Sequence, residues 1–221
     1  TVLASTDGRF AVTLNEGSDD ISILDAETLE ETRVPIRDDM NRLSISPDGN
    51  WVMAWYDPNA ESLGTSDGIY SFSEVSFVQL STGTHYPMAV GFSPAGVRWT
   101  QDGERAIVLS DSSLAIIDLS QTPLSPTMLE LAEDPLQAPL SEEVELSPDG
   151  HYAFIRQRGS NDVAIADLDT LSLSRIPVGE DPSDLDVSPD GTQLAVVARG
   201  DHQLWLLDPS DPFASAEILD L

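Results

Sequence analysis

An Asp-Gly pair that follows a short apolar segment recurs along the whole chain, and this repeat most narrowly limits what the chain can fold into. The five pairs are Asp7-Gly8, Asp48-Gly49, Asp102-Gly103, Asp149-Gly150 and Asp190-Gly191. Three of them are preceded by Ser-Pro. Proline fixes φ at the first corner of a tight turn, and glycine relieves the corner where φ is positive. Each pair therefore predicts a turn between two strands.

A second feature repeats in phase with the first, an apolar run that ends in Asp. It occurs at Asp25, Asp118, Asp167 and Asp208, at a nearly constant distance after an Asp-Gly pair. The second unit departs from this pattern, because Gln79 replaces the Asp and an insertion precedes it. The best-preserved copy runs from Asn161 to Asp208. Such self-similarity is typical of a repeat architecture.

Each repeat predicts four strands. A short inner segment, such as Leu43 to Ser46, comes before the Asp-Gly turn. A nearly continuous apolar run follows the turn, which favours a strand covered on both faces. These runs are Phe10 to Leu14, Trp51 to Trp55, Ala106 to Leu109, Tyr152 to Ile155 and Leu194 to Ala198. A third strand and a more polar fourth strand complete the unit. Four antiparallel strands in roughly 40 to 55 residues are typical of a β-propeller blade.

The predicted fold is therefore all-β, a propeller of four-stranded antiparallel blades in a single domain. The approximate blades are residues 1–37, 38–90, 91–133, 134–179 and 180–221. Two alternatives stay open at this point. The five blades close a ring by themselves, or they belong to a propeller of six to eight blades.

Three segments carry a family resemblance: Asn161 to Asp167, Ile176 to Gly179, and Asp186 to Gly191. They resemble the YVTN-type β-propeller repeat, which is related to TolB-like and lactonase-like propellers. The resemblance implies a fold that serves binding proteins, enzymes and surface proteins alike, so it specifies no chemistry. It favours the longer propeller and an extracytoplasmic location, whether periplasmic, cell-surface or secreted.

The charge balance limits the partners. Thirty-nine acidic residues face ten basic ones, all of them Arg, for a formal net charge of −29. Nucleic acids and anionic lipids are bound through Lys and Arg, so both are excluded as partners. A basic or metal-bearing protein or small-molecule ligand is favoured. Two explanations of the acid excess stay open: halophilic adaptation to high salt, and compositional bias with selection for solubility.

Several chemistries lack their sequence signatures. The chain has no Cys, which excludes disulfides, thiol nucleophiles and cysteine metal sites. It has no transmembrane-length apolar run, nucleophile elbow or phosphate-binding loop. The three His residues, His85, His151 and His202, fall in turns or strand ends of different units. We therefore predict a non-enzymatic binding or scaffold protein. The alternative is a metal-dependent lactonase-like hydrolase, whose divalent ion would lie in the central channel among scattered ligands.

The loops that depart from the repeat are the candidate recognition elements. The largest is the insertion at residues 57–74, and the connections 88–96 and 132–143 are also long. Strand order places all three at the end of the blades opposite the Asp-Gly turns. The candidate binding residues of the insertion are Asp57, Asn59, Glu61, Asp67 and Tyr70. We predict no cofactor, with calcium bound by these oxygens as the alternative.

A second candidate lies on the inner strands. Arg98, Glu145 and Asp186 stand two residues before the Ser or Thr of their turns, on positions that the repeat makes equivalent. Arg98 and Glu145 are predicted to pair across neighbouring blades, either as a structural ion pair or as part of a polar ligand site. The four Trp residues are predicted to lie in the core.

Overall fold

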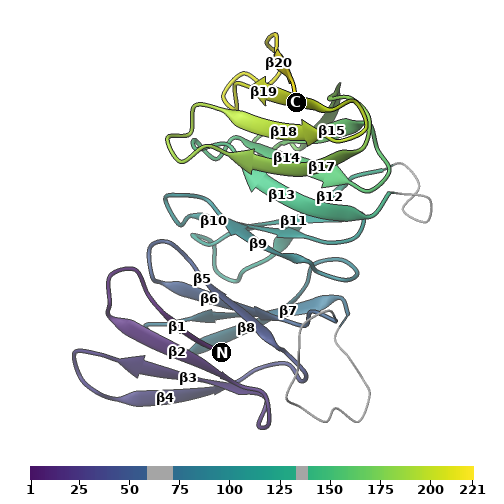
Figure 1. Ribbon diagram of the computed structural model, residues 1–221. Coiled ribbons are helices and arrows are strands. Elements are labelled where there is room, and N and C mark those ends of the chain that lie inside the picture. The colour runs from purple at the N-terminus through teal and green to yellow at the C-terminus, as the bar shows by residue number, and fades with distance from the viewer. Residues whose placement is uncertain (59–71, 133–138) are drawn as a thin grey trace. The chain divides into compact units, whose positions relative to one another are not determined.

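Five four-stranded antiparallel sheets make up the computed structural model, which describes residues 1–58, 72–132 and 139–221 (Figure 1). In every sheet the strands lie side by side in chain order. This is the arrangement predicted for propeller blades, and the sheets are numbered here as blades 1 to 5. Within the described ranges, no helix is long and apolar enough to cross a membrane.

The strands of each blade lie inside the ranges expected from the repeat. Blade 1 consists of β1 (Val2–Ala4), β2 (Phe10–Asn15), β3 (Asp20–Asp25) and β4 (Glu31–Pro35). Blade 2 consists of β5 (Arg42–Ile45), β6 (Trp51–Trp55), β7 (Glu74–Gln79) and β8 (Thr84–Ala89). Blade 3 consists of β9 (Gly96–Trp99), β10 (Arg105–Leu109), β11 (Ser113–Asp118) and β12 (Pro126–Glu130). Blade 4 consists of β13 (Ser141–Leu146), β14 (Tyr152–Gln157), β15 (Asp162–Asp167) and β16 (Ser172–Pro177). Blade 5 consists of β17 (Pro182–Val187), β18 (Leu194–Ala198), β19 (Gln203–Leu207) and β20 (Glu217–Asp220).

The chain divides into two compact units. The first comprises residues 1–110 and 115–128, and the second comprises residues 111–114 and 129–221. Blades 1 and 2 and most of blade 3 belong to the first unit, and blades 4 and 5 belong to the second. That all five blades form a single propeller domain stays a prediction.

The Asp-Gly turns repeat one hydrogen-bond arrangement in all five blades. The hydroxyl of the Ser or Thr that opens the turn donates to the Asp carboxylate at 2.5 to 2.6 Å. The same hydroxyl oxygen accepts the backbone N–H five residues later at 2.9 to 3.0 Å. The glycine lies at φ between 71° and 74°, a conformation that side chains with a Cβ rarely adopt. These bonds satisfy the polar groups of a turn that joins the inner strand to the more buried second strand of the blade.

Turns of adjacent blades also pack against one another. Thr6 Oγ1 in blade 1 donates to the backbone oxygen of Pro47 in blade 2 at 2.5 Å. A Cβ on Gly103 of blade 3 would lie 2.6 Å from Cγ of Asp48 in blade 2. In the second unit, a Cβ on Gly191 would overlap Pro148 of blade 4. The glycine is thus required for its φ angle and again for the close approach of the neighbouring turn.

The second repeated Asp forms the turn between the third and fourth strands. Its carboxylate accepts the backbone N–H two residues later, at 2.9 Å for Asp25, 2.9 Å for Asp118, 3.0 Å for Asp167 and 2.9 Å for Asp208. In blade 2 the replacement Gln79 accepts instead from the Thr82 hydroxyl at 3.0 Å. Both repeated Asp residues are therefore turn formers.

The core lies between blades. One apolar cluster joins blades 1 and 2, a second joins blades 2 and 3, and another joins blades 4 and 5. As predicted, β6, β10 and β14 have nearly continuous burial along the strand. The same prediction is wrong for β2 and β18, where buried and half-buried residues alternate. Each of these two strands buries only one of its faces.

The packing of turns predicts unequal effects for two matched glycine substitutions. Gly8→Ala and Gly103→Ala both introduce a Cβ at positive φ, which costs about 1 to 2 kcal/mol. A Cβ on Gly8 meets no atom within 4 Å, whereas one on Gly103 displaces the Asp48 carboxylate from its turn. Urea denaturation should therefore show that Gly103→Ala loses about 1 to 3 kcal/mol more stability than Gly8→Ala. Equal losses would contradict the packing of one turn on the next.

The turn carboxylates predict acid sensitivity. Hydrogen bonds from Ser5, Thr100 and Ser188 hold the pKa of Asp7, Asp102 and Asp190 below the ordinary value of 3.8. A lowered folded-state pKa adds stability that is fully present above pH 3.8 and is lost as pH falls through the folded-state pKa. The melting temperature should therefore fall between pH 4 and pH 2 in about 1 M NaCl, where charge repulsion is screened.

Ser188→Ala serves as the control for this pH dependence. It removes the hydroxyl donor of Asp190, so the pKa of that carboxyl should move back toward 3.8 and the drop in melting temperature should become smaller. A melting temperature that stays level or rises below pH 4 in high salt would count against the role assigned to these carboxylates.

Candidate binding site

The connections of each blade are divided between its two ends. The backbone N–H of Ala26 donates to Arg9 O at 2.7 Å, which joins the third-to-fourth-strand turn to the Asp-Gly turn. At the opposite end, the N–H of Val90 donates to Ser73 O at 2.9 Å, which joins the end of β8 to the segment before β7. We call the first the turn end and the second the loop end. The described ends of the blade 2 insertion, at Asp57 and Ser73, thus lie at the loop end.

An exposed aromatic cluster marks the loop end of blade 2. Its members are Tyr56, Phe72 and Phe92. Tyr56 and Phe72 meet edge to face with ring centroids 5.6 Å apart, and Phe72 and Phe92 stack at 5.9 Å. Phe72 is 37% exposed and Phe92 is 61% exposed. The cluster therefore combines aromatic packing geometry with two exposed rings, those of Phe72 and Phe92, beside the half-buried ring of Tyr56.

Strand ends hold these three rings in place. Tyr56 directly follows β6, and Phe72 comes shortly before β7. Phe92 follows β8, and the adjacent Ser93 donates its backbone N–H to Phe72 O at 2.5 Å. Sequence reasoning missed Phe92 because it lies outside the insertion, in the connection after β8. The available signal was the length of the connection 88–96, which departs from the repeat and contains Phe92.

Two ion pairs flank the aromatic cluster. Arg42 Nε lies 3.2 Å from Asp57 Oδ2, and Asn41 makes reciprocal hydrogen bonds of 2.8 and 2.9 Å with the Asp57 backbone. On the other side, Arg37 Nε lies 3.0 Å from Glu74 Oε2. Both arginines are about half exposed, so these pairs orient the loops more than they stabilise the fold.

Further carboxylates concentrate at the loop end of blade 1. The backbone N–H of Asp39 donates to Asp19 Oδ1 at 3.1 Å, and Asp38 is adjacent in sequence. Burial raises the pKa of Asp39, and the negative charges of Asp19 and Asp38 raise it further. Like charges disfavour the ionised form in this way when they are held close together. The loop end of blades 1 and 2 is therefore both aromatic and acidic.

The predicted site residues have different outcomes. Asp57 lies beside the aromatic cluster, whereas Asn59, Glu61, Asp67 and Tyr70 lie outside the described residues. Arg98, Glu145 and Asp186 occupy matching places on their inner strands, because they pair with Ile107, Phe154 and Ala195 on the next strand. Arg98 and Glu145 belong to different compact units, so their pairing stays a prediction.

The tryptophans do lie in or against the core. Trp51 is 6% exposed, and Trp55, Trp99 and Trp205 are partly buried against apolar clusters. The indole N–H of Trp99 donates to Ser44 Oγ at 2.8 Å, which ties blade 3 to blade 2. Their role is therefore packing between blades.

Metal binding stays a prediction. No group of three or more His, Asp or Glu residues in the described ranges is arranged to hold a metal ion. His151 contacts Asp169 at the turn end, and His85 Nε2 lies 3.0 Å from Ser76 Oγ. Asp190 Oδ1 accepts hydrogen bonds from the hydroxyls of Ser188 and Thr192.

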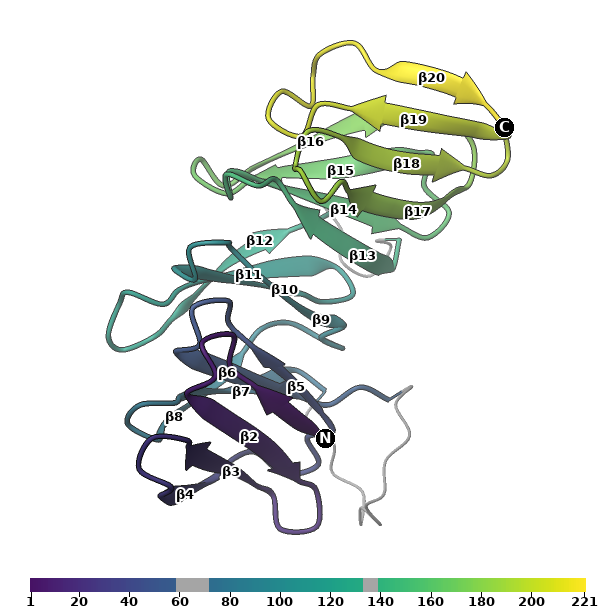
Figure 2. The ribbon, with the colours of Figure 1, turned by 60° about the vertical axis from the view of Figure 1, so that its left-hand side comes forward.

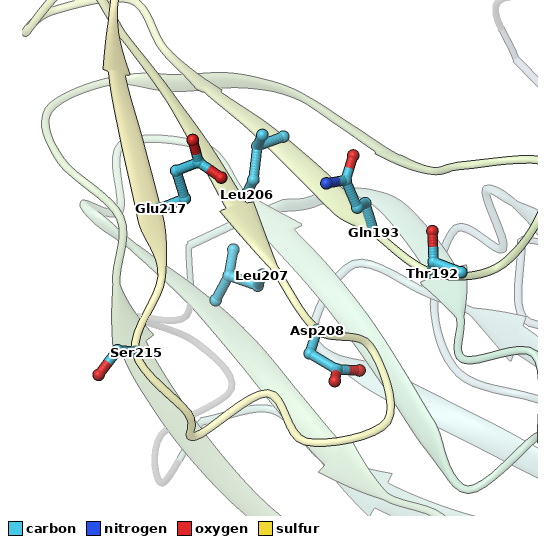
Figure 3. A pocket seen from close by; sticks show the side chains of 7 residues that line it. All are labelled: Thr192, Gln193, Leu206, Leu207, Asp208, Ser215 and Glu217. Carbon is cyan, nitrogen blue, oxygen red and sulfur yellow. The ribbon is translucent and has the colours of Figure 1, made fainter.

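A shallow pocket opens on blade 5 (Figure 3). It is open to solvent and has a volume of about 210 Å³. The lining residues are Thr192, Gln193, Leu206, Leu207, Asp208, Ser215 and Glu217. Asp208 is already engaged by Ser210, whose backbone N–H and hydroxyl both donate to it. The pocket therefore has little free polar chemistry for a small molecule.

Comparison with solved structures identifies the fold of the chain. The chain aligns with the dihydro-heme d1 dehydrogenase NirN at a TM-score of 0.65 and 17% identity, covering 99% of this chain and 45% of that one. It aligns with the β-propeller domain of Cps50 (Swd1) from Myceliophteria thermophila at a TM-score of 0.58 and 14% identity, covering 94% and 65%. The chain has the β-propeller fold. At these identities the likeness shows the fold alone.

Comparison of sequences gives one curated relative. Antigen Lp49 of Leptospira interrogans is 27% identical over 210 residues, which cover 85% of this chain. The chain spans only 42% of the length of that antigen. No family model matches the chain. The resemblance to the YVTN-type repeat therefore stays a prediction.

Proposed function

We propose that this chain is a non-enzymatic propeller module that binds a basic protein segment at the loop end of blades 1 and 2. The observation that carries the proposal is the aromatic cluster of Tyr56, Phe72 and Phe92, whose rings contact one another and yet face solvent. Exposed contiguous apolar surface on a soluble domain is typical of an interaction site.

The charge of the chain selects the kind of partner. The net charge of −29 attracts basic segments and repels acidic ones. At the site itself, Arg and Lys side chains can stack on the aromatic rings by cation–π attraction. They can also reach the carboxylates of Asp57 and Glu74, which flank the cluster, and those of Asp38 and Asp39 beyond them. Aromatic and acidic groups therefore recognise the same side chains.

The surrounding structure favours binding without rearrangement. The cluster is held between the ends of β6, β7 and β8, and the ion pairs Arg42–Asp57 and Arg37–Glu74 orient the adjoining loops. A preorganised surface loses little conformational entropy on association. This is how a rigid sheet with variable loops supports recognition.

A position outside the cytoplasm, exposed at a surface, is part of the proposal. The supporting observation is the similarity to Antigen Lp49, since an antigen is accessible to antibodies. Among the solved propellers that resemble this chain are a Cps50 domain and a chain of the mitotic checkpoint complex, the latter at a TM-score of 0.62 and 12% identity. A binding role is thus within the range of the fold. No observation in the described residues favours the alternative of a metal-dependent hydrolase.

Selection from a random peptide library tests the binding proposal. Peptides enriched on the chain should carry net positive charge. Phe92→Ala should lower their affinity for the chain at least about tenfold, since buried aromatic anchors dominate such interfaces. Affinity is measured by fluorescence anisotropy of the labelled peptides.

Phe213→Ala is the matched control, because Phe213 is 56% exposed but lies in blade 5, far along the chain from the cluster. It should leave affinity within about twofold of the unmodified chain. Enriched peptides without positive charge, or equal losses of affinity from both substitutions, would contradict the proposal.

A further inference from the structure

In three blades an apolar face of the sheet is covered by the next blade along the chain, and the corresponding face of blade 5 is not. We call the face of a blade toward the next blade along the chain its forward face, and the opposite face its rear face. In the first unit, Val12, Ile21 and Ile23 of blade 1 are buried against blade 2. Met53, Val75 and Phe77 of blade 2 are buried in turn against blade 3. In the second unit, Phe154, Val163 and Ile165 of blade 4 are buried against blade 5.

The same positions in blade 5 are apolar and open. By strand register the forward face of blade 5 presents Ala195, Val197, Leu204, Leu206 and Leu219 in and beside its central strands, with the carboxylates Asp184, Asp186 and Glu217 at its margins. Ala195, Val197, Leu204 and Leu206 are half-buried, and Leu219 is 41% exposed. Within the second unit, no described segment packs on this face. The pocket of Figure 3 borders this face through Leu206 and Glu217, and it is also lined by Leu207 of the rear-face cluster.

The rear face of blade 1 has a different chemistry. Asn15 Nδ2 donates to Asp20 Oδ1 at 2.6 Å and to Ser22 Oγ at 3.0 Å. Ser22 Oγ in turn donates to Glu31 Oε1 at 2.9 Å. These polar side chains share the face with Leu24, which is 40% exposed, so the face is mixed rather than apolar. The forward face of blade 5 has no such network in its central strands.

We propose that the forward face of blade 5 is an interblade surface, and that its occupant is a further four-stranded blade of the same repeat type in the same polypeptide. Three described interfaces show what covers this face elsewhere: the rear face of the next blade, such as Val52, Ala54 and Val78 of blade 2. Figure 2 shows the four strands β17 to β20 side by side, so an intact sheet is available for such packing.

The length of similar proteins supports this occupant. The chain spans 42% of Antigen Lp49, 45% of NirN and 65% of the Cps50 domain. Apolar sheet faces bury well only against another apolar face of matching width, at roughly 25 cal/mol per Å². A further blade supplies that width, and it also covers Leu219 on the outer strand β20.

Thiol labelling tests the proposal, because the chain has no Cys of its own. Single variants Ala195→Cys and Leu206→Cys are prepared in the protein as expressed from its gene and in the 221-residue chain. Leu171→Cys, in an exposed turn of blade 4, is the fast control, and Ile165→Cys is the protected reference. Reaction with an aromatic disulfide reagent is followed by absorbance at a fixed pH, since the thiolate is the reacting form.

In the protein as expressed from its gene, we expect residues 195 and 206 to react at least about 100-fold more slowly than residue 171, independently of protein concentration. In the 221-residue chain they should react within about tenfold of residue 171. Fast reaction in both proteins would overturn the proposal. Protection in the 221-residue chain would overturn it too, since a segment of that chain would then cover the face. Protection that disappears on dilution would show a second copy as the occupant.

Discussion

A pair of hydrogen bonds made by one Ser or Thr hydroxyl recurs in every blade, and the rest of the structure depends on it. In each blade a Ser or Thr hydroxyl donates to the Asp of the Asp-Gly turn and accepts a backbone N–H from the strand beyond it. The turn between the first two strands of a blade thereby has hydrogen-bond partners for its polar groups. Because adjacent turns also touch, as Gly103 and Asp48 do, the same arrangement spaces one blade from the next. The apolar clusters between blades lie on the sheets that these turns connect.

This arrangement also changes the interpretation of the acid excess. Nine of the 39 acidic residues are acceptors in the two kinds of repeated turn. Their charge is a by-product of a structural role, and only the remaining carboxylates need another explanation. Some of these gather at the loop end, where Asp19 and Asp38 contribute to the raised pKa of Asp39. The charge of the chain is therefore partly structural and partly available for recognition.

The fold was predictable from the sequence, whereas the candidate site was predictable only in its location. Asp, Gly and Pro mark turns through local backbone preferences, and these preferences repeat in every unit, so strand order and blade bounds follow from short segments. The contact of Phe72 with Phe92 joins two separate connections, and no local preference encodes it. The half-covered state of β2 and β18 was also beyond the sequence, because their apolar runs match those of fully covered strands and only the neighbouring blades decide the burial.

The separation of the turn end from the loop end has a consequence for how such a protein can change. Contacts between neighbouring blades lie in the sheets and at both ends of the strands: Gly103 approaches Asp48 at the turn end, and Ser110 Oγ donates to Val90 O at 2.8 Å at the loop end. Connections at the loop end can lengthen, as the one between β6 and β7 has done, while β6 and β7 keep their antiparallel register. A loop that makes no contact with the next blade can therefore be exchanged by itself, because the repeated Asp-Gly turns lie at the opposite end of the strands and are left unchanged.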